Sequence, residues 1–221
     1  MNISDNFIRG SIVLISIIIL ILGGSIPRYD SLYAAPFQPK PIAFSIWILI
    51  YLSLFVMAFK LFNLKKYPMI NYIVGFLSLS LLFGGGWGLT VLDYPIVSSI
   101  MLYISALCAI ISTGLLKPNL KTIDGWLISL GPSLLAGWLS LASGLGFSVA
   151  ANSINMSAPN WILLPTGLLA SLASIYSGTP GVGLALLWGG LYSKKNWVTN
   201  SLIIVAIISI ISSMNKGLKN K

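Results

Sequence analysis

The chain has 221 residues, of which 57% are hydrophobic and only 8% are charged. A soluble domain usually carries roughly 25% charged residues, and one with so few charges would expose large apolar patches and aggregate. The net charge is +9, but the basic residues stand singly or in pairs between apolar runs, which is typical of loops between membrane spans. We therefore expect an all-α, polytopic transmembrane helix bundle that does not bind nucleic acid.

The missing residue types exclude common kinds of chemistry. The sequence has no His and no Glu, and its four acidic residues are all Asp. Proton transfer near neutral pH usually relies on His or a perturbed Glu. A single cysteine, Cys108, offers neither a disulfide nor a thiolate cluster for a metal. We expect no catalytic residues, no metal site and no enzymatic activity.

Eight apolar segments follow one another along the chain. A helix needs ~20 residues to cross a bilayer, with ~17 as a practical minimum. The second to fifth segments are long enough, the first, sixth and eighth are marginal, and the seventh is too short by itself, which leaves seven or eight spans open with a preference for eight helices. The segments are Ile12–Ile26, Pro41–Phe62, Ile70–Leu92, Ile96–Leu116, Ile123–Ala150, Trp161–Tyr176, Val182–Ser193 and Val198–Met214.

The first segment has two interpretations. Arg9 precedes it and Ala34–Ala35 follow it, as in a signal peptide. The distance from Ile26 to those alanines is long for a cleavage site, and Pro36 comes directly after them. An uncleaved first span is therefore favoured.

Charge in the connections predicts the orientation. Basic residues flank the second and fourth connections, whereas the third and fifth have none. The positive-inside rule then places the N-terminus in the cytoplasm and the first loop outside. Lys194 and Lys195 fall outside in this arrangement, against the rule. We expect a multi-pass protein of a bacterial-type inner membrane.

The seven tryptophans fall into two groups. Trp126, Trp161 and Trp197 begin segments, where indole rings favour the headgroup region. Trp47, Trp87 and Trp138 lie inside their segments, where the indole N–H needs a partner. The inner group lines a cavity or serves bundle packing, and position alone does not decide between them.

Proline and glycine mark close contacts and breaks. Gly84–Gly86 and Gly137 allow helices to approach closely, and next to Trp87 and Trp138 they could also leave room for a flat ligand. Packing is the favoured interpretation. Pro132, Pro165 and Pro180 are expected to bend their segments, with a break at Gly178–Gly181.

An aromatic stripe opens the second segment. Phe44, Trp47 and Tyr51 follow one another at spacings of three and four, which places them on one helical face. Such a stripe is more often bundle core than binding site, although beneath a proline-stiffened loop it could also floor a pocket.

These residues resemble the tryptophan-rich sensory protein family, the relatives of TspO and the mitochondrial translocator protein. The similarity is carried by Phe37-Gln-Pro39 and Phe44-Ser-Ile-Trp47-Ile-Leu-Ile-Tyr51, by Pro132-Ser-Leu-Leu-Ala-Gly-Trp138-Leu-Ser-Leu-Ala142, and by Trp87 on the third segment. It covers roughly residues 10–152. The resemblance implies a five-helix core over residues 1–152 and a C-terminal extension over 153–221.

The sequence also departs from the family pattern. Phe37 stands where family members have a loop tryptophan, and Lys40 separates Pro39 from Pro41. Gly146 replaces an asparagine of the fifth helix. Three segments follow the core, and Ala185-Leu-Leu-Trp188-Gly189 resembles the longer, bacterial-type branch of the family.

The resemblance implies a receptor or sensor for a flat hydrophobic ligand, with porphyrin or haem as ligand and no resident cofactor. The expected partners are the lipid bilayer, a hydrophobic small molecule such as a tetrapyrrole, and a second copy of the chain in a homodimer. The alternatives are a transporter or facilitator of small lipophilic molecules and an accessory subunit of a membrane complex. The expected ligand-binding residues are Phe37, Phe44, Trp47, Tyr51, Trp87, Trp138 and Ala142.

Overall fold

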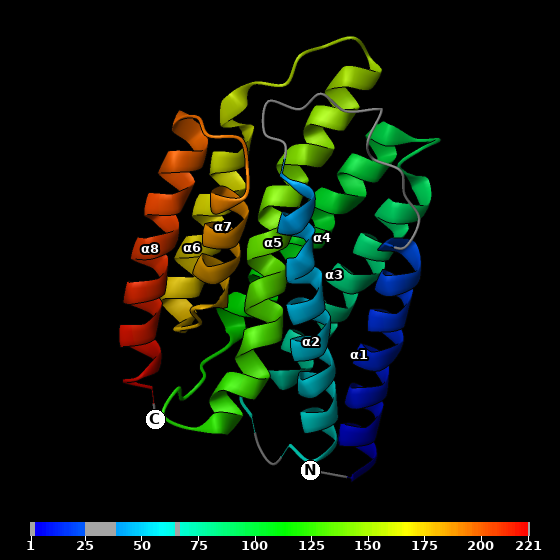
Figure 1. Ribbon diagram of the computed structural model, residues 1–221. Helices are drawn as coiled ribbons and strands as arrows, with labels where there is room; N and C mark the ends of the chain where they lie inside the picture. Colours follow the sequence, from blue (N-terminus) through cyan, green and yellow to red (C-terminus); the bar gives the residue numbers. More distant parts are fainter. Residues whose placement is uncertain (1–2, 25–38, 65–66, 221) are drawn as a thin grey trace.

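The computed structural model describes residues 3–24, 39–64 and 67–220, and within these ranges it contains only helices and the loops between them (Figure 1). The all-α expectation is confirmed. The helices are α1 (Ile3–Gly24), η1 (Pro41–Ser45), α2 (Ile46–Phe62), α3 (Ile70–Thr90), α4 (Pro95–Leu115), α5 (Ile123–Ser153), η2 (Asn160–Leu163), α6 (Leu164–Ser177), α7 (Gly181–Leu191) and α8 (Trp197–Gly217).

Six helical segments in the described part of the chain are long and apolar enough to cross a membrane. The other two, α6 and α7, are shorter. At 1.5 Å per residue α7 is only about 17 Å long, little more than half the ~30 Å of a bilayer core. Figure 1 shows the turn between them ending short of the level at which α5 begins. The pair therefore enters and leaves the bundle on the same side.

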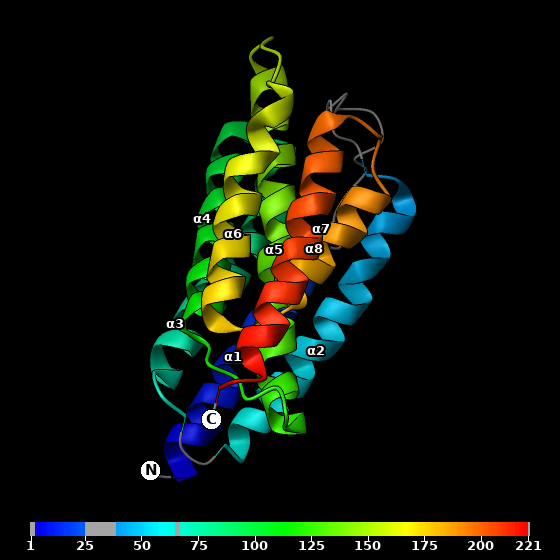
Figure 2. The same cartoon turned by 90° about the vertical axis from the view of Figure 1, so that its left-hand side faces the viewer.

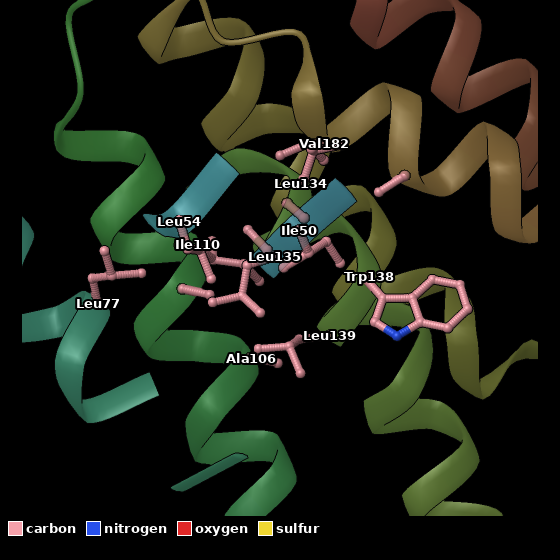
Figure 3. Packing of buried hydrophobic residues seen from close by; sticks show 14 of the residues in the cluster. Ile50, Leu54, Leu77, Ala106, Ile110, Leu134, Leu135, Trp138, Leu139 and Val182 are labelled. Atoms are coloured by element: carbon pink, nitrogen blue, oxygen red, sulfur yellow. The ribbon is translucent and has the colours of Figure 1, made fainter. Parts of the chain in front are cut away.

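The first five helices form a closed ring. Each packs against two neighbours in the order α1–α2–α5–α4–α3 and back to α1. Aliphatic side chains fill the middle of this ring, as Figure 3 shows for Ile50 and Leu54 of α2, Leu77 of α3, Ile110 of α4 and Leu135 of α5. At this level the ring is a packed core, so a ligand site within it has to lie nearer one end.

Helix α5 is the centre of the whole bundle. It packs against α2 and α4 in the ring and against α6 and α7 outside it, and α8 covers α6 and α7 (Figure 2). Its glycines allow these contacts: a Cβ on Gly131 would lie 2.9 Å from the backbone N of Leu54, and one on Gly137 2.5 Å from the carbonyl oxygen of Val182. The favoured interpretation of these glycines as packing residues agrees with the contacts.

Serine and threonine hydroxyls join the helices. In a bilayer the backbone carbonyls near a helix interface have no water to bind, so a hydroxyl from the neighbouring helix is a good partner. These cross-helix bonds are Ser105 to Ser80 O and Ser112 to Ile73 O between α4 and α3, Ser99 to Gly146 O and Thr113 to Pro132 O between α4 and α5, and Thr166 to Ser140 O between α6 and α5.

Of the three prolines expected to bend a segment, only Pro132 lies inside a helix. Pro165 is in the first turn of α6, and Pro180 is the residue before α7. At those positions the missing N–H of proline costs no intrahelical hydrogen bond, and the fixed φ of proline favours the start of a helix. The expectation of a bend is therefore wrong for Pro165 and Pro180, whereas the expected break at Gly178–Gly181 is the turn between α6 and α7.

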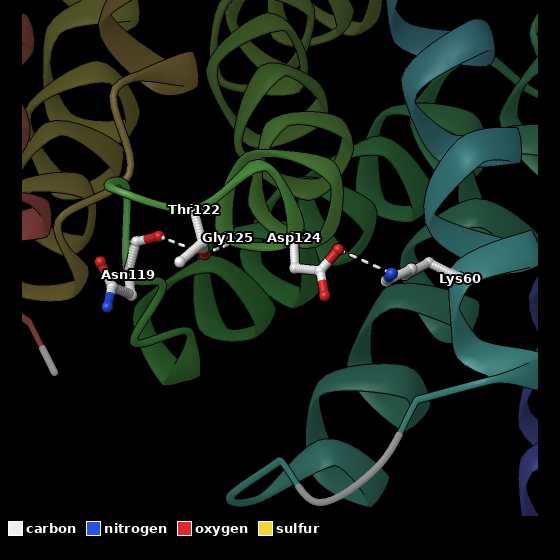
Figure 4. Close-up of polar contacts among 5 residues, drawn as sticks. All are labelled: Lys60, Asn119, Thr122, Asp124 and Gly125. Carbon is white, nitrogen blue, oxygen red and sulfur yellow. Dashed lines mark hydrogen bonds and ion pairs between the residues drawn. The ribbon is translucent and has the colours of Figure 1, made fainter.

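The start of α5 lies at the end of the bundle that holds both chain termini (Figure 1), and polar contacts fix it there (Figure 4). Thr122 caps the helix by accepting a hydrogen bond from the backbone N–H of Gly125, and its hydroxyl donates to Asn119 O. Asp124 forms an ion pair with Lys60 at the end of α2, with 2.6 Å between the two atoms. An exposed pair of this kind contributes at most about 1 kcal/mol, so it orients the two helix ends more than it stabilises them.

Candidate functional site

Four of the expected ligand-binding residues form one chain of ring contacts, here called the aromatic cluster. Trp47 stacks on Tyr51 with 5.2 Å between ring centroids and 22° between the planes. The edge of Trp138 meets Trp47 at 6.4 Å and Phe44 at 5.7 Å, both nearly perpendicular. Offset and edge-on arrangements of this kind are the favourable ones for aromatic pairs.

The local sequence explains why these rings meet. Phe44 lies in η1, which continues directly into α2, so the spacing of three and four residues keeps Phe44, Trp47 and Tyr51 on neighbouring positions of one face. Trp138 lies seven residues after Gly131, two helical turns along the α5 face that approaches α2. The close approach at Gly131 brings the indole of Trp138 within reach of the α2 rings.

The members of the cluster differ in exposure. Trp138 is 3% exposed and forms the inner layer, whereas Phe44 is 41% exposed and Trp47 and Tyr51 are partly buried. The cluster thus offers partly open aromatic faces over a buried indole. Such a surface binds flat apolar molecules by stacking and requires no ionisable group.

Helix α7 reaches the same place, which sequence reasoning missed. The indole N–H of Trp188 donates to the carbonyl oxygen of Ala43, one residue before Phe44, at 3.0 Å. Gly189 lies against Trp138, because a Cβ there would be 3.5 Å from the Trp138 ring. Trp188 also packs on Tyr192, with ring centroids 4.6 Å apart. The spacing of four residues between Trp188 and Tyr192 predicts that the two rings pack together, but no local pattern predicts the hydrogen bond to Ala43.

Two of the remaining expected residues, Trp87 and Ala142, lie outside the chain of ring contacts that forms the cluster. Trp87 is in the last turn of α3, which packs on α1 and α4, so it comes from the opposite side of the ring and is partly buried against the core. Ala142 is one turn beyond Trp138 on α5 and is partly buried. Phe37 lies outside the described residues.

The tryptophans expected at the membrane surface lie at helix starts. Trp161 and Trp197 are more than half exposed, and Trp126 donates its indole N–H to Leu120 O in the preceding loop. They therefore differ from Trp138 in both burial and neighbours.

Among the described residues no group of three His, Cys, Asp or Glu side chains could hold a metal ion. The chemistry available at the aromatic cluster is stacking and hydrogen bonding.

Comparison with known proteins agrees with the sequence resemblance and extends it. A family model described as TSPO-like protein matches residues 11–216. No curated protein and no solved structure matches the chain. The match includes α6, α7 and nearly all of α8, so the similarity reaches well beyond residues 10–152. Proteins of this family are receptor- or transporter-type membrane proteins and not enzymes. The chain is a multi-pass integral membrane protein that belongs to the TSPO-like family.

Proposed function

We propose that this protein is a membrane receptor that binds a flat hydrophobic ligand, such as a porphyrin, at the aromatic cluster. The observation that carries the proposal is the joining of Phe44, Trp47, Tyr51 and Trp138 into one partly exposed set of rings. The packed aliphatic centre of the ring of helices leaves the end near η1 as the place for a ligand. Trp87 and Ala142 belong to the proposed site as its far wall. Phe37, which lies outside the described residues, stays a proposed ligand-binding residue.

The proposal also covers orientation and organisation. The end of the bundle with both termini holds Arg9, Lys60, Lys117, Lys121 and Lys216. This charge supports a cytoplasmic N-terminus. In that orientation the aromatic cluster would lie near the outer surface of a bacterial-type inner membrane. Residues 1–152 would then be the ligand-binding core, and residues 153–221 would brace it through the bond between Trp188 and Ala43.

The test is a titration of detergent-purified protein with protoporphyrin IX, followed by the absorption of the porphyrin so that removing a tryptophan does not remove the signal. We expect a dissociation constant in the micromolar range or below. A micromolar value corresponds to a binding free energy of about 8 kcal/mol in favour of the complex. Trp47→Phe and Trp138→Phe should each weaken it about three- to tenfold, since a well-placed aromatic contact contributes ~0.5–1.5 kcal/mol.

The matched control is Trp161→Phe, which removes an exposed tryptophan outside the aromatic cluster. It should bind porphyrin like the unmodified protein. Unchanged affinity in both Trp47→Phe and Trp138→Phe would show that the ligand binds elsewhere.

A transporter is the second candidate, and a specific observation favours it. The turn between α6 and α7 is buried and rich in hydroxyls: Ser177 bonds to Thr179 at 2.8 Å, and Ser209 of α8 bonds to Ser174. Interrupted helices with polar turns are typical of transporters. Accumulation of porphyrin inside sealed vesicles that contain the protein, beyond the amount the protein itself binds, would favour transport over reception.

A further inference from the structure

Four lysines gather where the chain end meets the loop between α4 and α5. The backbone N–H of Leu120 donates to the carbonyl oxygen of Gly217 at 3.1 Å, and the side-chain amide of Asn220 donates to Pro118 O at 3.0 Å. Each of these four residues has a lysine as its direct neighbour in the chain. We call these lysines the basic patch: Lys117, Lys121, Lys216 and Lys219.

The basic patch is assembled by the fold from two distant parts of the chain. The bond between Asn220 and Pro118 joins residues 102 positions apart, and Figures 1 and 2 both show the chain end beside the loop that follows α4. The positive-inside rule explains why lysines lie at this end of the bundle. It does not explain why lysines of two segments share one place, where their like charges repel.

No carboxylate balances the basic patch within the part of the chain that the structure describes. The only ion pair in these ranges joins Lys60 to Asp124, so the nearest acidic residue along the sequence is already bound. The side chains of the patch are exposed. A group of ammonium ions without acidic partners is suited to bind anionic oxygens.

The basic patch adjoins a surface that faces lipid. The ammonium of Lys117 lies 3.4 Å from the centre of the Tyr176 ring and donates to Tyr176 O at 3.1 Å. Tyr176 is 66% exposed, and Leu172, four residues earlier on the same face of α6, is 64% exposed. Met214 and Leu218 are exposed beside the lysines at the end of α8. Cations therefore stand directly next to side chains that contact acyl chains.

Because cations beside an apolar, lipid-facing surface match a negatively charged lipid, we propose that the basic patch binds the headgroup of an anionic phospholipid. Its phosphate oxygens accept hydrogen bonds from the lysine ammonium groups, and its acyl chains lie along the exposed faces of α6 and α8. Four lysines match a lipid with two phosphates, such as cardiolipin, better than a lipid with one.

The bound lipid would act on the short helix pair. It would join the loop between α4 and α5 to the chain end, and Asn220 of that end donates to Ser177 O at the turn between α6 and α7. The site lies at the end of the bundle with both termini, away from η1 and the aromatic cluster (Figure 1). It is therefore independent of the ligand proposed there.

The test is a lipid titration followed by native mass spectrometry. Protein stripped of lipid in neutral detergent is titrated with cardiolipin, phosphatidylglycerol and phosphatidylcholine that carry the same acyl chains. We expect cardiolipin to bind most tightly and phosphatidylcholine least, and the difference to shrink as salt is raised. Equal binding of the three lipids would overturn the proposal.

The variant is Lys216→Gln with Lys219→Gln, which removes two exposed charges. It should weaken cardiolipin binding roughly five- to twentyfold, since a lysine near an anionic headgroup contributes about fivefold, and leave phosphatidylcholine unchanged. The matched control is Lys194→Gln with Lys195→Gln between α7 and α8, which removes the same charge at the opposite end. Equal effects of the two double variants, or no effect of the first, would contradict a site at the basic patch.

Two further measurements identify the place and the source of the phosphate. Deuterium exchange at residues 117–121 and 216–220 should slow when cardiolipin binds, and protection confined to other segments would place the lipid elsewhere. Inorganic phosphate in large excess over cardiolipin should not displace it, because phosphate lacks the acyl chains. Displacement at similar concentrations would show a site for soluble phosphate and overturn the lipid proposal.

Discussion

Gly137 sets the distance between the central helix and α7. A Cβ at this position would lie 2.5 Å from Val182 O and 2.9 Å from the Cβ of Ala185. The first atom belongs to the backbone of α7, and the second is bonded directly to that backbone. Neither can turn aside, so α7 must move to make room. Gly137→Ala should therefore lower the free energy of unfolding by about 1–3 kcal/mol, measured as the midpoint of thermal unfolding in detergent.

Gly75 is the matched control for this substitution. It also lies inside a helix, α3, but nothing stands within 4 Å of an added Cβ. Alanine restricts the unfolded chain more than glycine does, so Gly75→Ala should stabilise the protein by about 0.5–1 kcal/mol. An equal loss of stability in both variants would mean that close packing is not the role of Gly137.

Trp188 is the second residue with a separable effect. Its N–H bond to Ala43 O joins two segments 145 positions apart in the chain. Trp188→Phe keeps an aromatic ring but removes the N–H donor. This should lower the free energy of unfolding by about 0.5–1.5 kcal/mol. Backbone amides of residues 40–46 should then exchange with deuterium faster, whereas Trp197→Phe, at an exposed position, should leave them unchanged.

The sequence predicts part of the site at this scale. The spacing of Phe44, Trp47 and Tyr51 is a local property, so it could be recognised from helical periodicity. The contribution of Trp188 could not, because no local pattern indicates which distant carbonyl an indole will bind. The contact of Trp138 with Trp47 depends on how α5 lies against α2, which the resemblance suggested and the spacing alone did not.

Among the helices, the short pair α6 and α7 is held by the C-terminal residues. Gly178 ends α6 with φ at 83°, a left-handed conformation that favours glycine. The side-chain amide of Asn220 donates to Ser177 O at 3.3 Å and to Pro118 O at 3.0 Å. The chain end thus connects the α6–α7 turn to the loop between α4 and α5.

Asn220→Ala should loosen this arrangement. Two hydrogen bonds are lost, so the free energy of unfolding should fall by about 1–2 kcal/mol, measured by thermal unfolding. Deuterium exchange should rise at residues 177–181. Asn200→Ala provides the control, because Asn200 lies exposed on α8. Unchanged exchange at the turn in Asn220→Ala would show that the chain end does not hold it.

Helix limits follow from the sequence where apolar runs and helices coincide. The segments expected at Pro41–Phe62 and Ile70–Leu92 match η1 with α2 and α3 within two residues. The first helix begins at Ile3, nine residues before the expected Ile12. Its polar first turns are held by hydrogen bonds to other segments, because Asn6 donates to Leu64 O and Arg9 donates to Asn71. The ring order of the helices could not be expected, since apolarity does not specify a neighbour.

For the molecule as a whole, the arrangement of the termini predicts which residues share a side of the membrane. Both termini lie at one end of the bundle, and the loop between α5 and η2 lies at the other (Figure 1). In a Cys108→Ser background, Lys219→Cys and Ser157→Cys should react with an impermeant maleimide from opposite sides of intact cells. Ser157→Cys should be labelled from outside, and Lys219→Cys only after the membrane is opened. Labelling of both from one side would contradict this topology.

The central claim is that a flat ligand binds where α2, α5 and α7 meet. The most direct measurement is photolabelling with a protoporphyrin that carries a diazirine, followed by mass spectrometry of the labelled peptides. The account predicts labels within residues 40–51, 138–142 and 188–195, all displaced by unmodified protoporphyrin. Displaceable labels confined to the lipid-facing surfaces of α1 and α8 would contradict it.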